Sequence, residues 1–72
     1  MFWGLVVLVK INGLVDEVPD NSSVKDVLIA RNIPLEIAII ALNGEIVKRE
    51  NWENIMLSAN DDMEIIRIIG GG

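Results

Sequence analysis

The sequence predicts an α+β roll, in which a mixed sheet of four to five strands packs against one main helix. Three observations indicate this fold: two Asn-Gly pairs that each separate two strand-like segments, one capped amphipathic segment between them, and a last apolar segment before three glycines. The order strand, strand, helix, strand, strand, short turn, strand allows a crossover through the helix and parallel pairing at the centre of the sheet. We expect residues 1–69 to form a single domain and residues 70–72 to form a flexible tail.

The first four strands are predicted as two β-hairpins. Asn12-Gly13 separates LVVLVKI (residues 5–11) from LVDEV (residues 14–18), and Asn43-Gly44 separates IAIIAL (residues 37–42) from EIVKR (residues 45–49). Asn and Gly both tolerate a positive φ, which a two-residue type I′ turn requires. Each Asn-Gly pair is therefore expected to join two antiparallel neighbours.

One amphipathic helix is predicted between the hairpins, from about Ser23 to Arg31. Ser23 is a suitable N-cap, and Asp26 follows three residues later, where a carboxylate answers the cap and favours the helix dipole. Residues three and four apart are apolar, so the helix is expected to bury one face, made of Val24, Val27 and Leu28. The helix would pack through this face across the sheet.

The last part of the chain predicts a short helical turn followed by a strand. The polar segment ENWENIMLSANDD (residues 50–62) contains Trp52, which we expect to be an anchor in the core or at its rim. The strand MEIIRII (residues 63–69) has Glu64 and Arg67 three residues apart, so its phase is ambiguous. Regular alternation would bury Met63 and Ile65, and the opposite phase would bury Ile66 and Ile68.

We favour the first phase, which leaves Ile66 and Ile68 on the outer face of the sheet with Glu64. Val6 and Leu8 share the face of Lys10 in the first strand, and are expected to be exposed in the same way. Because one helix covers only one side of the sheet, a modestly apolar outer face is expected to be a docking surface for a partner protein. Ile66, Ile68 and Arg67 are the candidate docking residues.

The composition points to a binding or carrier protein with no catalytic residues of its own. The 72 residues include no cysteine, no histidine and no tyrosine, which excludes a thiol nucleophile, a thiolate metal site and the usual general base. The carboxylates show no EF-hand-type spacing, so no metal is expected. The net charge of −5 and the scattered basic residues argue against a nucleic-acid partner.

The apolar start MFWGLVVLVK does not have the properties of a membrane segment or a leader. The run stops at Lys10, well short of the roughly 20 apolar residues that a transmembrane helix needs. It also lacks the positive n-region and small-residue cleavage site of a signal peptide. We therefore expect a cytoplasmic protein with no membrane partner.

The three glycines at positions 70–72 raise the question of what they do. They are either a plain disordered end or a tether whose terminal carboxylate, on Gly72, is the working group. Without Cβ atoms, Gly71 and Gly70 would let an extended backbone pass through a narrow channel in a partner enzyme. Trp3 is either a packed edge or a frayed end.

Four stretches resemble the thiamin-biosynthesis sulfur carrier family, which has the ubiquitin-like β-grasp fold. They are LVKINGLVDEV (residues 8–18), SSVKDVL (22–28), ALNGEIVKRENW (41–52) and DDMEIIRIIGGG (61–72). Two departures are the additional apolar residues at the start and the turn at residues 60–62, Asn-Asp-Asp, where the family commonly has a glycine.

This resemblance implies a cycle that uses Gly72. A ubiquitin-activating-like adenylyltransferase would adenylate the carboxylate of Gly72 with ATP, and a sulfur donor system would convert the product to a thiocarboxylate. Thiazole synthase would then accept the sulfur. The carrier itself would bind no cofactor, and ATP would be used by the activating partner.

Several alternatives stay open. A related carrier serves molybdopterin synthase as its small subunit, but that branch typically has a proline before the diglycine, and EIIRIIGGG has none. Carriers for tRNA thiolation or cysteine synthesis would use the same chemistry. A ubiquitin-like protein modifier and an interaction module with an inert tail are alternatives of other classes.

Overall fold

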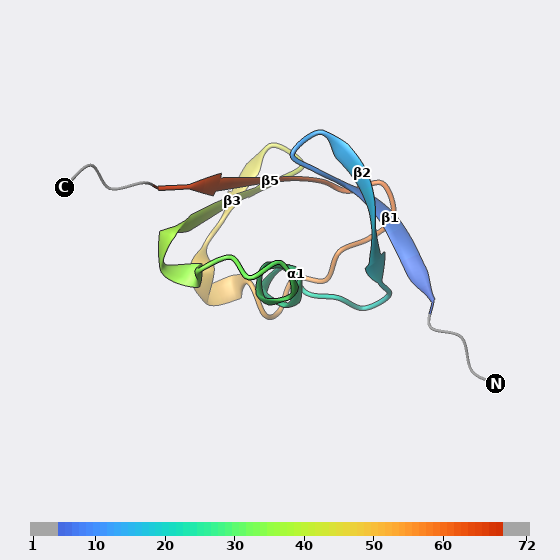
Figure 1. Ribbon diagram of the computed structural model, residues 1–72, viewed down its shortest axis with the longest axis horizontal. Helices are drawn as coiled ribbons and strands as arrows, with labels where there is room; N and C mark the ends of the chain where they lie inside the picture. The colour runs from blue at the N-terminus through green and yellow to red at the C-terminus, as the bar shows by residue number, and fades with distance from the viewer. Residues whose placement is uncertain (1–4, 69–72) are drawn as a thin grey trace.

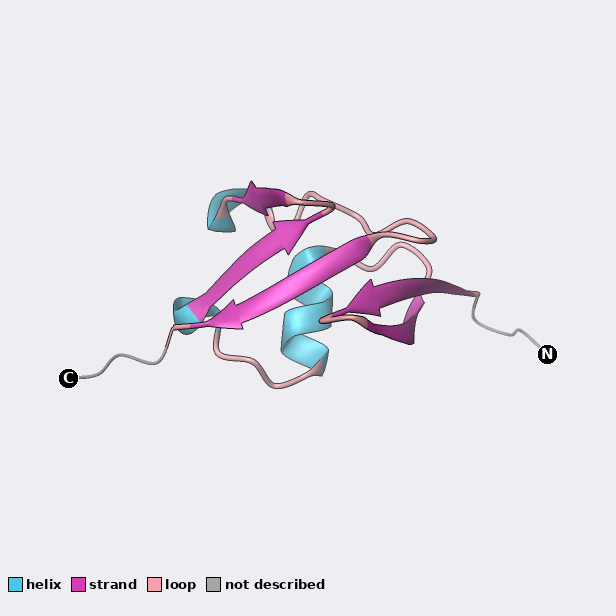
Figure 2. Ribbon diagram, turned by 90° about the horizontal axis from the view of Figure 1, so that it is seen from above, coloured by secondary structure: helices cyan, strands magenta, loops and turns pink. Residues whose placement is uncertain are grey.

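The computed structural model describes residues 5–68, which form a five-stranded mixed sheet with one α-helix lying across it (Figures 1 and 2). Trp3 and the three glycines Gly70, Gly71 and Gly72 lie outside the described residues. The strand order is β2-β1-β5-β3-β4. In chain order the elements are β1 Val6–Ile11, β2 Leu14–Pro19, α1 Val24–Ala30, η1 Leu35–Ile37, β3 Ala38–Leu42, β4 Glu45–Val47, η2 Arg49–Asn51 and β5 Asp62–Arg67. The predicted α+β roll is confirmed.

Both Asn-Gly pairs form the expected hairpin turns. Asn12 and Gly13 have φ values of 53° and 85°, and Asn43 and Gly44 have φ values of 52° and 87°. Two consecutive residues with positive φ define the type I′ turn, whose twist matches that of the flanking strands. The antiparallel pairs β1·β2 and β3·β4 are therefore set by local sequence.

The helix begins at the predicted cap. The main-chain N–H of Asp26 donates to Ser23 Oγ at 3.0 Å, and the N–H of Ser23 donates to Asp26 Oδ2 at 3.0 Å, which completes a capping box. Helical residues run from Val24 to Ala30, with Ser23 and Arg31 as the two caps, so the predicted range holds. Asn32 follows with a φ of 58°, a conformation that ends the helix.

The parallel pair lies at the centre of the sheet, but it joins β1 to β5. The sequence had suggested that the crossover through the helix would provide this pairing between its flanking strands. Instead β2 and β3 are separated by two strands, because each hairpin pairs with β5 through its first strand. As a result β5 runs between the two hairpins (Figure 1).

Two short 3₁₀ turns flank the second hairpin. The turn η2 at Arg49–Asn51 confirms the predicted helical turn, and it shortens β4, which ends at Val47 rather than at the predicted residue 49. The turn η1 at Leu35–Ile37 was not predicted. Pro34 is its N-cap and starts it with a φ of −62°.

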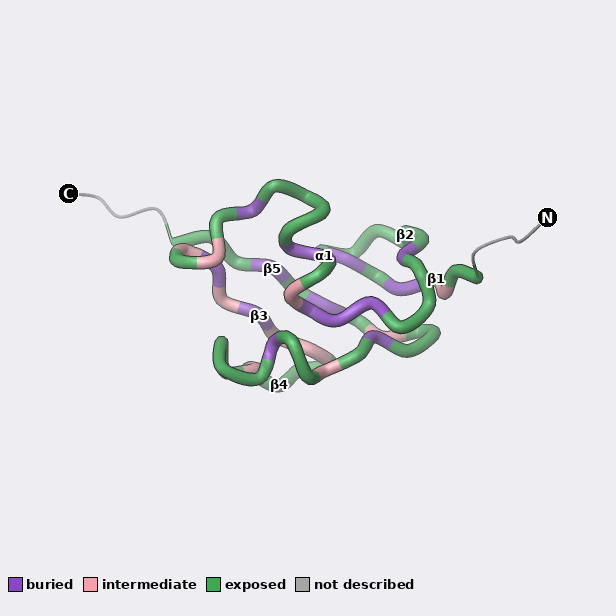
Figure 3. The backbone as a smooth tube through the Cα atoms, turned by 90° about the horizontal axis from the view of Figure 1, so that it is seen from below, coloured by how far each residue is buried: buried purple, intermediate pink, exposed green. Residues whose placement is uncertain are grey.

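The core lies between α1 and the face of the sheet that the helix covers. Buried stretches of β1, β5, β3 and α1 gather in the middle of the molecule (Figure 3). Trp52 is only 2 % exposed, and its Nε1 donates to the carbonyl oxygen of Val47 at 3.0 Å, so the predicted anchor is confirmed as a core residue. Among residues 5–68, no helix has the length and apolar character needed to span a membrane.

Candidate functional site

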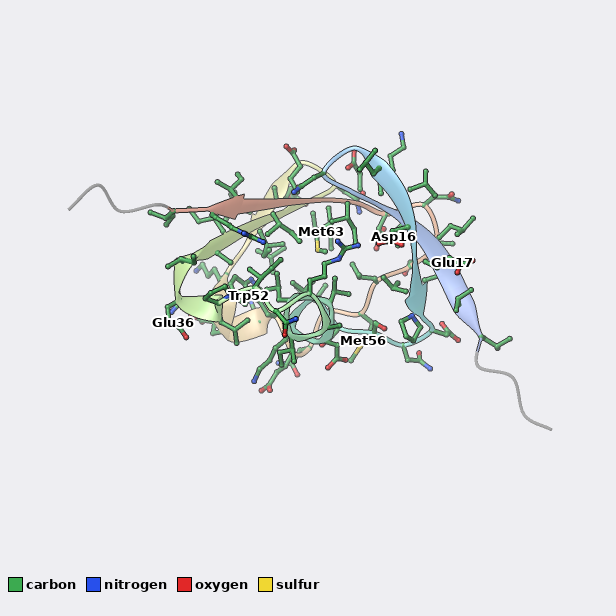
Figure 4. All side chains as sticks on the ribbon, viewed as in Figure 1. Asp16, Glu17, Glu36, Trp52, Met56 and Met63 are labelled. Atoms are coloured by element: carbon green, nitrogen blue, oxygen red, sulfur yellow. The ribbon has the colours of Figure 1, made fainter. Side chains whose placement is uncertain are left out.

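The last strand alternates regularly between the core and the outer face of the sheet. Met63 and Ile65 are 0 % and 9 % exposed, whereas Ile66 and Ile68 are 48 % and 50 % exposed. Figure 4 shows Met63 pointing from β5 toward α1. The exposed fractions therefore confirm the favoured phase, in which Ile66 and Ile68 lie on the outer face. The docking role of these two residues stays a prediction.

β5 is held to the end of the described chain. It pairs with β3 from Met63 to Arg67, and the N–H of Ile68 then donates to the carbonyl oxygen of Ile37 at 2.7 Å. Gly70, Gly71 and Gly72, the predicted working residues, follow this anchor and lie outside the described residues. The structure thus places the attachment point of the tail at the edge of the outer face.

Three apolar residues next to this attachment point, Ile39, Ile66 and Ile68, form what we call the tail-side patch together with Ile46, the diagonal neighbour of Ile39 on β4. Ile39 of β3 lies opposite Ile66, and Ile46 of β4 lies opposite Ala41, which in turn faces Glu64. Residues opposite one another in an antiparallel pair share a face. Ile46 is 66 % exposed and Ile39 is half-buried, so the patch is open to solvent on one side of the sheet.

Val6 and Leu8 are exposed as expected, but the register separates them from the tail-side patch. Lys10 lies beside Asp62 in the parallel pair, so Leu8 and Ile66 are offset by six residues along the strands, or about 20 Å. The polar side chains of Lys10, Asp62 and Glu64 come between them on the same face. The outer face therefore carries two apolar areas, and only one adjoins the tail.

Arg67, the third candidate docking residue, points to the other side of the sheet from Ile66 and Ile68. Strand alternation places it on the side of Met63 and Ile65. It is nevertheless exposed, because the end of β5 extends beyond the core, and it lines a hollow of about 320 Å³ with Asn12 and Arg31. The structure does not bring Arg67 together with the two isoleucines.

Two asparagine side chains position β5, a role that the sequence analysis missed. Asn12 Oδ1 accepts a hydrogen bond from the N–H of Ile65 at 2.7 Å, and its Nδ2 donates to the carbonyl oxygen of Ile65 at 3.4 Å. Asn43 Oδ1 accepts from the N–H of Asp62 at 2.9 Å. In each hairpin, the side-chain amide of the turn asparagine thus forms hydrogen bonds with the main chain of β5. The only sequence signal was that the first position of each hairpin turn holds Asn rather than Gly or Asp.

The described residues contain no cluster that would bind a metal ion, and their two buried hydroxyl groups have structural partners. Ser22 Oγ donates to the carbonyl oxygen of Pro19, and Ser23 caps α1, so both buried hydroxyls have structural partners. Residues 5–68 hold no group of three or more acidic, histidine or cysteine side chains that would bind a metal ion. The pKa of Asp26 is lowered, mainly because the main-chain N–H of Ser23 donates to its carboxylate, and this effect belongs to the helix cap.

Comparison with known proteins gives the same family from sequence and from structure. The profile of the ThiS family matches residues 8–72. The sulfur carrier protein ThiS of Bacillus subtilis (strain 168) is 30 % identical over 53 residues, which cover 74 % of this chain and 80 % of that protein. The uncharacterized protein ycf40 of Trieres chinensis is 44 % identical over 36 residues, and that match spans about half of either chain, 50 % here and 49 % there.

Solved structures agree with these matches. The crystal structure of the thiamine biosynthesis protein ThiS from Geobacter metallireducens superposes with a TM-score of 0.80 at 26 % identity, covering 92 % of this chain and all of that one. The solution structure of a thiamine biosynthesis protein from the same organism gives a TM-score of 0.77, with 92 % and 88 % coverage. The mixed sheet with one helix is thus the β-grasp fold of these proteins.

Proposed function

This chain belongs to the ThiS family, and from that membership we propose that it is a sulfur carrier protein of thiamin biosynthesis that acts through the carboxylate of Gly72. The observation that carries the proposal is that the family match extends through residue 72 and so includes all three glycines. The β-grasp fold, which the Geobacter ThiS structures share, supports it. The chain would be a carrier rather than an enzyme.

The proposed chemistry activates a poor electrophile. The Gly72 carboxylate attacks the α-phosphorus of ATP in the adenylyltransferase, and pyrophosphate leaves. A hydrosulfide-level nucleophile from the sulfur donor system then attacks the acyl carbon of the adenylate and expels AMP, which leaves a thiocarboxylate. The thiocarboxylate sulfur is the nucleophile that thiazole synthase would use. All bond-making residues other than Gly72 belong to the partners.

We propose that the tail-side patch is where the partner enzymes dock. It is the exposed apolar area of the sheet that adjoins the last anchored residue, Ile68. Four residues follow this anchor, and four extended residues span at most about 14 Å. A partner bound at Ile66 and Ile68 would therefore hold its active site within that distance of the patch. Gly71 and Gly70 would supply the clearance for a narrow channel.

The test is the intact mass of the protein after incubation with the adenylyltransferase, ATP and sulfide. Fragmentation must locate the change at Gly72, because oxidation of one of the three methionines adds nearly the same mass as exchanging oxygen for sulfur. An ATP-dependent shift at Gly72 is the expected result. A competent enzyme that leaves Gly72 unchanged would contradict the proposal. Conjugates to lysine that survive denaturation would instead indicate a protein modifier.

The pathway needs its own measurement. Thiocarboxylated protein should support thiazole formation by thiazole synthase, and a variant without Gly71 and Gly72 should not. Transfer to a molybdopterin precursor with no thiazole formation would assign the chain to the related branch.

A further inference from the structure

A second candidate surface lies away from the tail, in a groove of about 670 Å³ between the edge strand β2 and α1. Its apolar lining consists of Val18 and Pro19 from β2 and Val27 and Ala30 from α1. This volume is in the range of sites that hold organic ligands or side chains of a partner. Figure 1 shows β2 on the opposite side of the view from the end of β5, and the groove shares no residue with the tail-side patch.

The outer edge of β2 has few free donors. The N–H groups of Lys10 and Asn12 donate toward β5, so the residues of β1 that bond to β2 are Val7, Val9 and Ile11. Their partners in the register are Val18, Asp16 and Leu14. The main-chain groups of the residues that alternate with these partners, Val15, Glu17 and Pro19, therefore face the open edge. Pro19 has no N–H. The N–H of Glu17 donates to Asp16 Oδ1 at 2.8 Å.

Such an edge resists the addition of a full strand, since strand pairing needs alternating donors and acceptors. It still presents carbonyl oxygens, at Val15 and Glu17, to a ligand that brings its own donors. The groove is therefore suited to cationic side chains, which are donors only.

The charges of the groove lining also favour a cationic ligand. Four carboxylates, those of Asp16, Glu17, Asp20 and Asp26, surround a single cation, Arg31. Arg31 forms an ion pair with Asp16 across the groove. Within residues 5–68, the other three carboxylates have no cationic side chain within ion-pair distance. Figure 4 shows Asp16 and Glu17 on opposite sides of β2, so negative charge lies both in the groove and along its outer rim.

We propose that this groove binds an extended, basic segment of a partner polypeptide. Apolar side chains of the segment would rest on Pro19 and Ala30, the exposed members of the apolar lining. Lys or Arg side chains would reach Asp16 at one end and Asp20 at the other. These two positions are four residues apart, Asp16 within β2 and Asp20 directly after its end, which is about 13 Å for extended chain. The segment would therefore carry basic residues four apart. Because the groove is remote from the tail-side patch, the segment would hold the carrier while its tail is engaged elsewhere.

The probe is the peptide acetyl-Gly-Lys-Val-Thr-Val-Lys-Gly-amide, titrated into the ¹⁵N-labelled full chain while amide shifts are recorded by NMR. The expected result is saturable shifts confined to residues 15–22 and 26–31, with an affinity that falls as salt rises. The same peptide with Gln in place of both Lys should bind more weakly. Spermidine tests whether charge alone suffices: an equal affinity for spermidine would overturn the assignment to a polypeptide.

A charge-matched pair of variants distinguishes the groove from the general acidity of the protein. Asp16→Asn with Asp20→Asn removes the two charges that the proposal assigns to the peptide, and the amide oxygens of the new Asn residues keep the acceptors that the main-chain N–H groups of Glu17 and Asn21 use. Glu36→Gln with Glu45→Gln removes two exposed charges elsewhere. The first pair should weaken peptide binding about 2- to 30-fold, the range for losing two exposed ion pairs, and the second pair much less. Equal effects, or shifts spread over the whole surface, would overturn the proposal.

Discussion

Replacing Asn12 with glycine tests whether its amide side chain holds the last strand. Glycine keeps the positive φ of 53° without strain, so the substitution removes the two hydrogen bonds to Ile65 and little else. The N–H of Ile65 loses its 2.7 Å partner in a residue that is 9 % exposed. A partly buried donor left without a partner costs about 1–3 kcal/mol, and the weaker 3.4 Å bond adds little.

Asn43→Gly is the matched control. It sits at the same position of the same turn type, with a φ of 52°, so the additional chain entropy of glycine in the unfolded state is the same for both variants. Its bonds to Asp62 and to Asp61 are exposed, and water replaces them more readily. We therefore expect Asn12→Gly to lose about 1 kcal/mol more than Asn43→Gly.

Urea unfolding followed by circular dichroism measures this difference directly. In a domain of this size, 1 kcal/mol corresponds to about 4–8 °C in Tm, which is well resolved in a thermal scan. Equal losses for the two variants, or a larger loss for Asn43→Gly, would refute the reasoning that the Asn12 contact is the buried and more stabilising one. Unchanged m-values are needed for the comparison, since they show that the unfolded states are alike.

Three further predictions concern the helix cap and the tail-side patch. Ser23→Ala should lower the free energy of unfolding by about 0.5–2 kcal/mol in urea, because the hydroxyl oxygen that accepts from the main-chain N–H of Asp26 is lost. Folding lowers the pKa of Asp26 below its ordinary value of 3.8, so the ionised carboxylate stabilises the folded protein above pH 3.8. This contribution is lost as the pH falls through the folded pKa. Asp26→Asn should therefore reduce the loss of unfolding free energy at acid pH, measured by urea unfolding at several pH values. Ile66→Ser should lower kcat/KM for thiocarboxylate formation about 5- to 30-fold, whereas Leu8→Ser, at nearly equal exposure, should leave it unchanged; equal effects would mean that the patch is not the docking site.

The features that local sequence determines were predictable. The two Asn-Gly turns need only their own backbone preferences, and the helix start needs only Ser23 and Asp26. The burial of Trp52 followed from its size and apolar ring. Each of these depends on contacts within a few residues or on a general property of the side chain.

The features that depend on distant contacts were not predictable from sequence. Asn12 and Ile65 are 53 residues apart, and their contact exists only once β1 and β5 lie side by side. The offset of about 20 Å between Leu8 and Ile66 is set by the parallel register of β1 and β5. The pattern of side chains within either strand does not determine that register. Arg67 is different, because alternation alone would have separated it from Ile66 and Ile68. The β2–α1 groove also required the tertiary arrangement, since its lining comes from a predicted strand and a predicted helix whose relative placement no local pattern determines.

The anchoring of β5 bears directly on how a carrier of this kind would deliver its terminal carboxylate. Asn43 fixes the start of the strand at Asp62, Asn12 fixes its middle at Ile65, and Ile37 holds Ile68 at the end. Under the proposed function, only four residues lie between this fixed point and the reacting carboxyl, a reach of at most about 14 Å. A tether this short gives a high effective concentration at a correctly placed active site and almost none at a misplaced one. Specificity for the partner would then depend on the geometry of docking at the tail-side patch, because glycine side chains offer nothing to recognise.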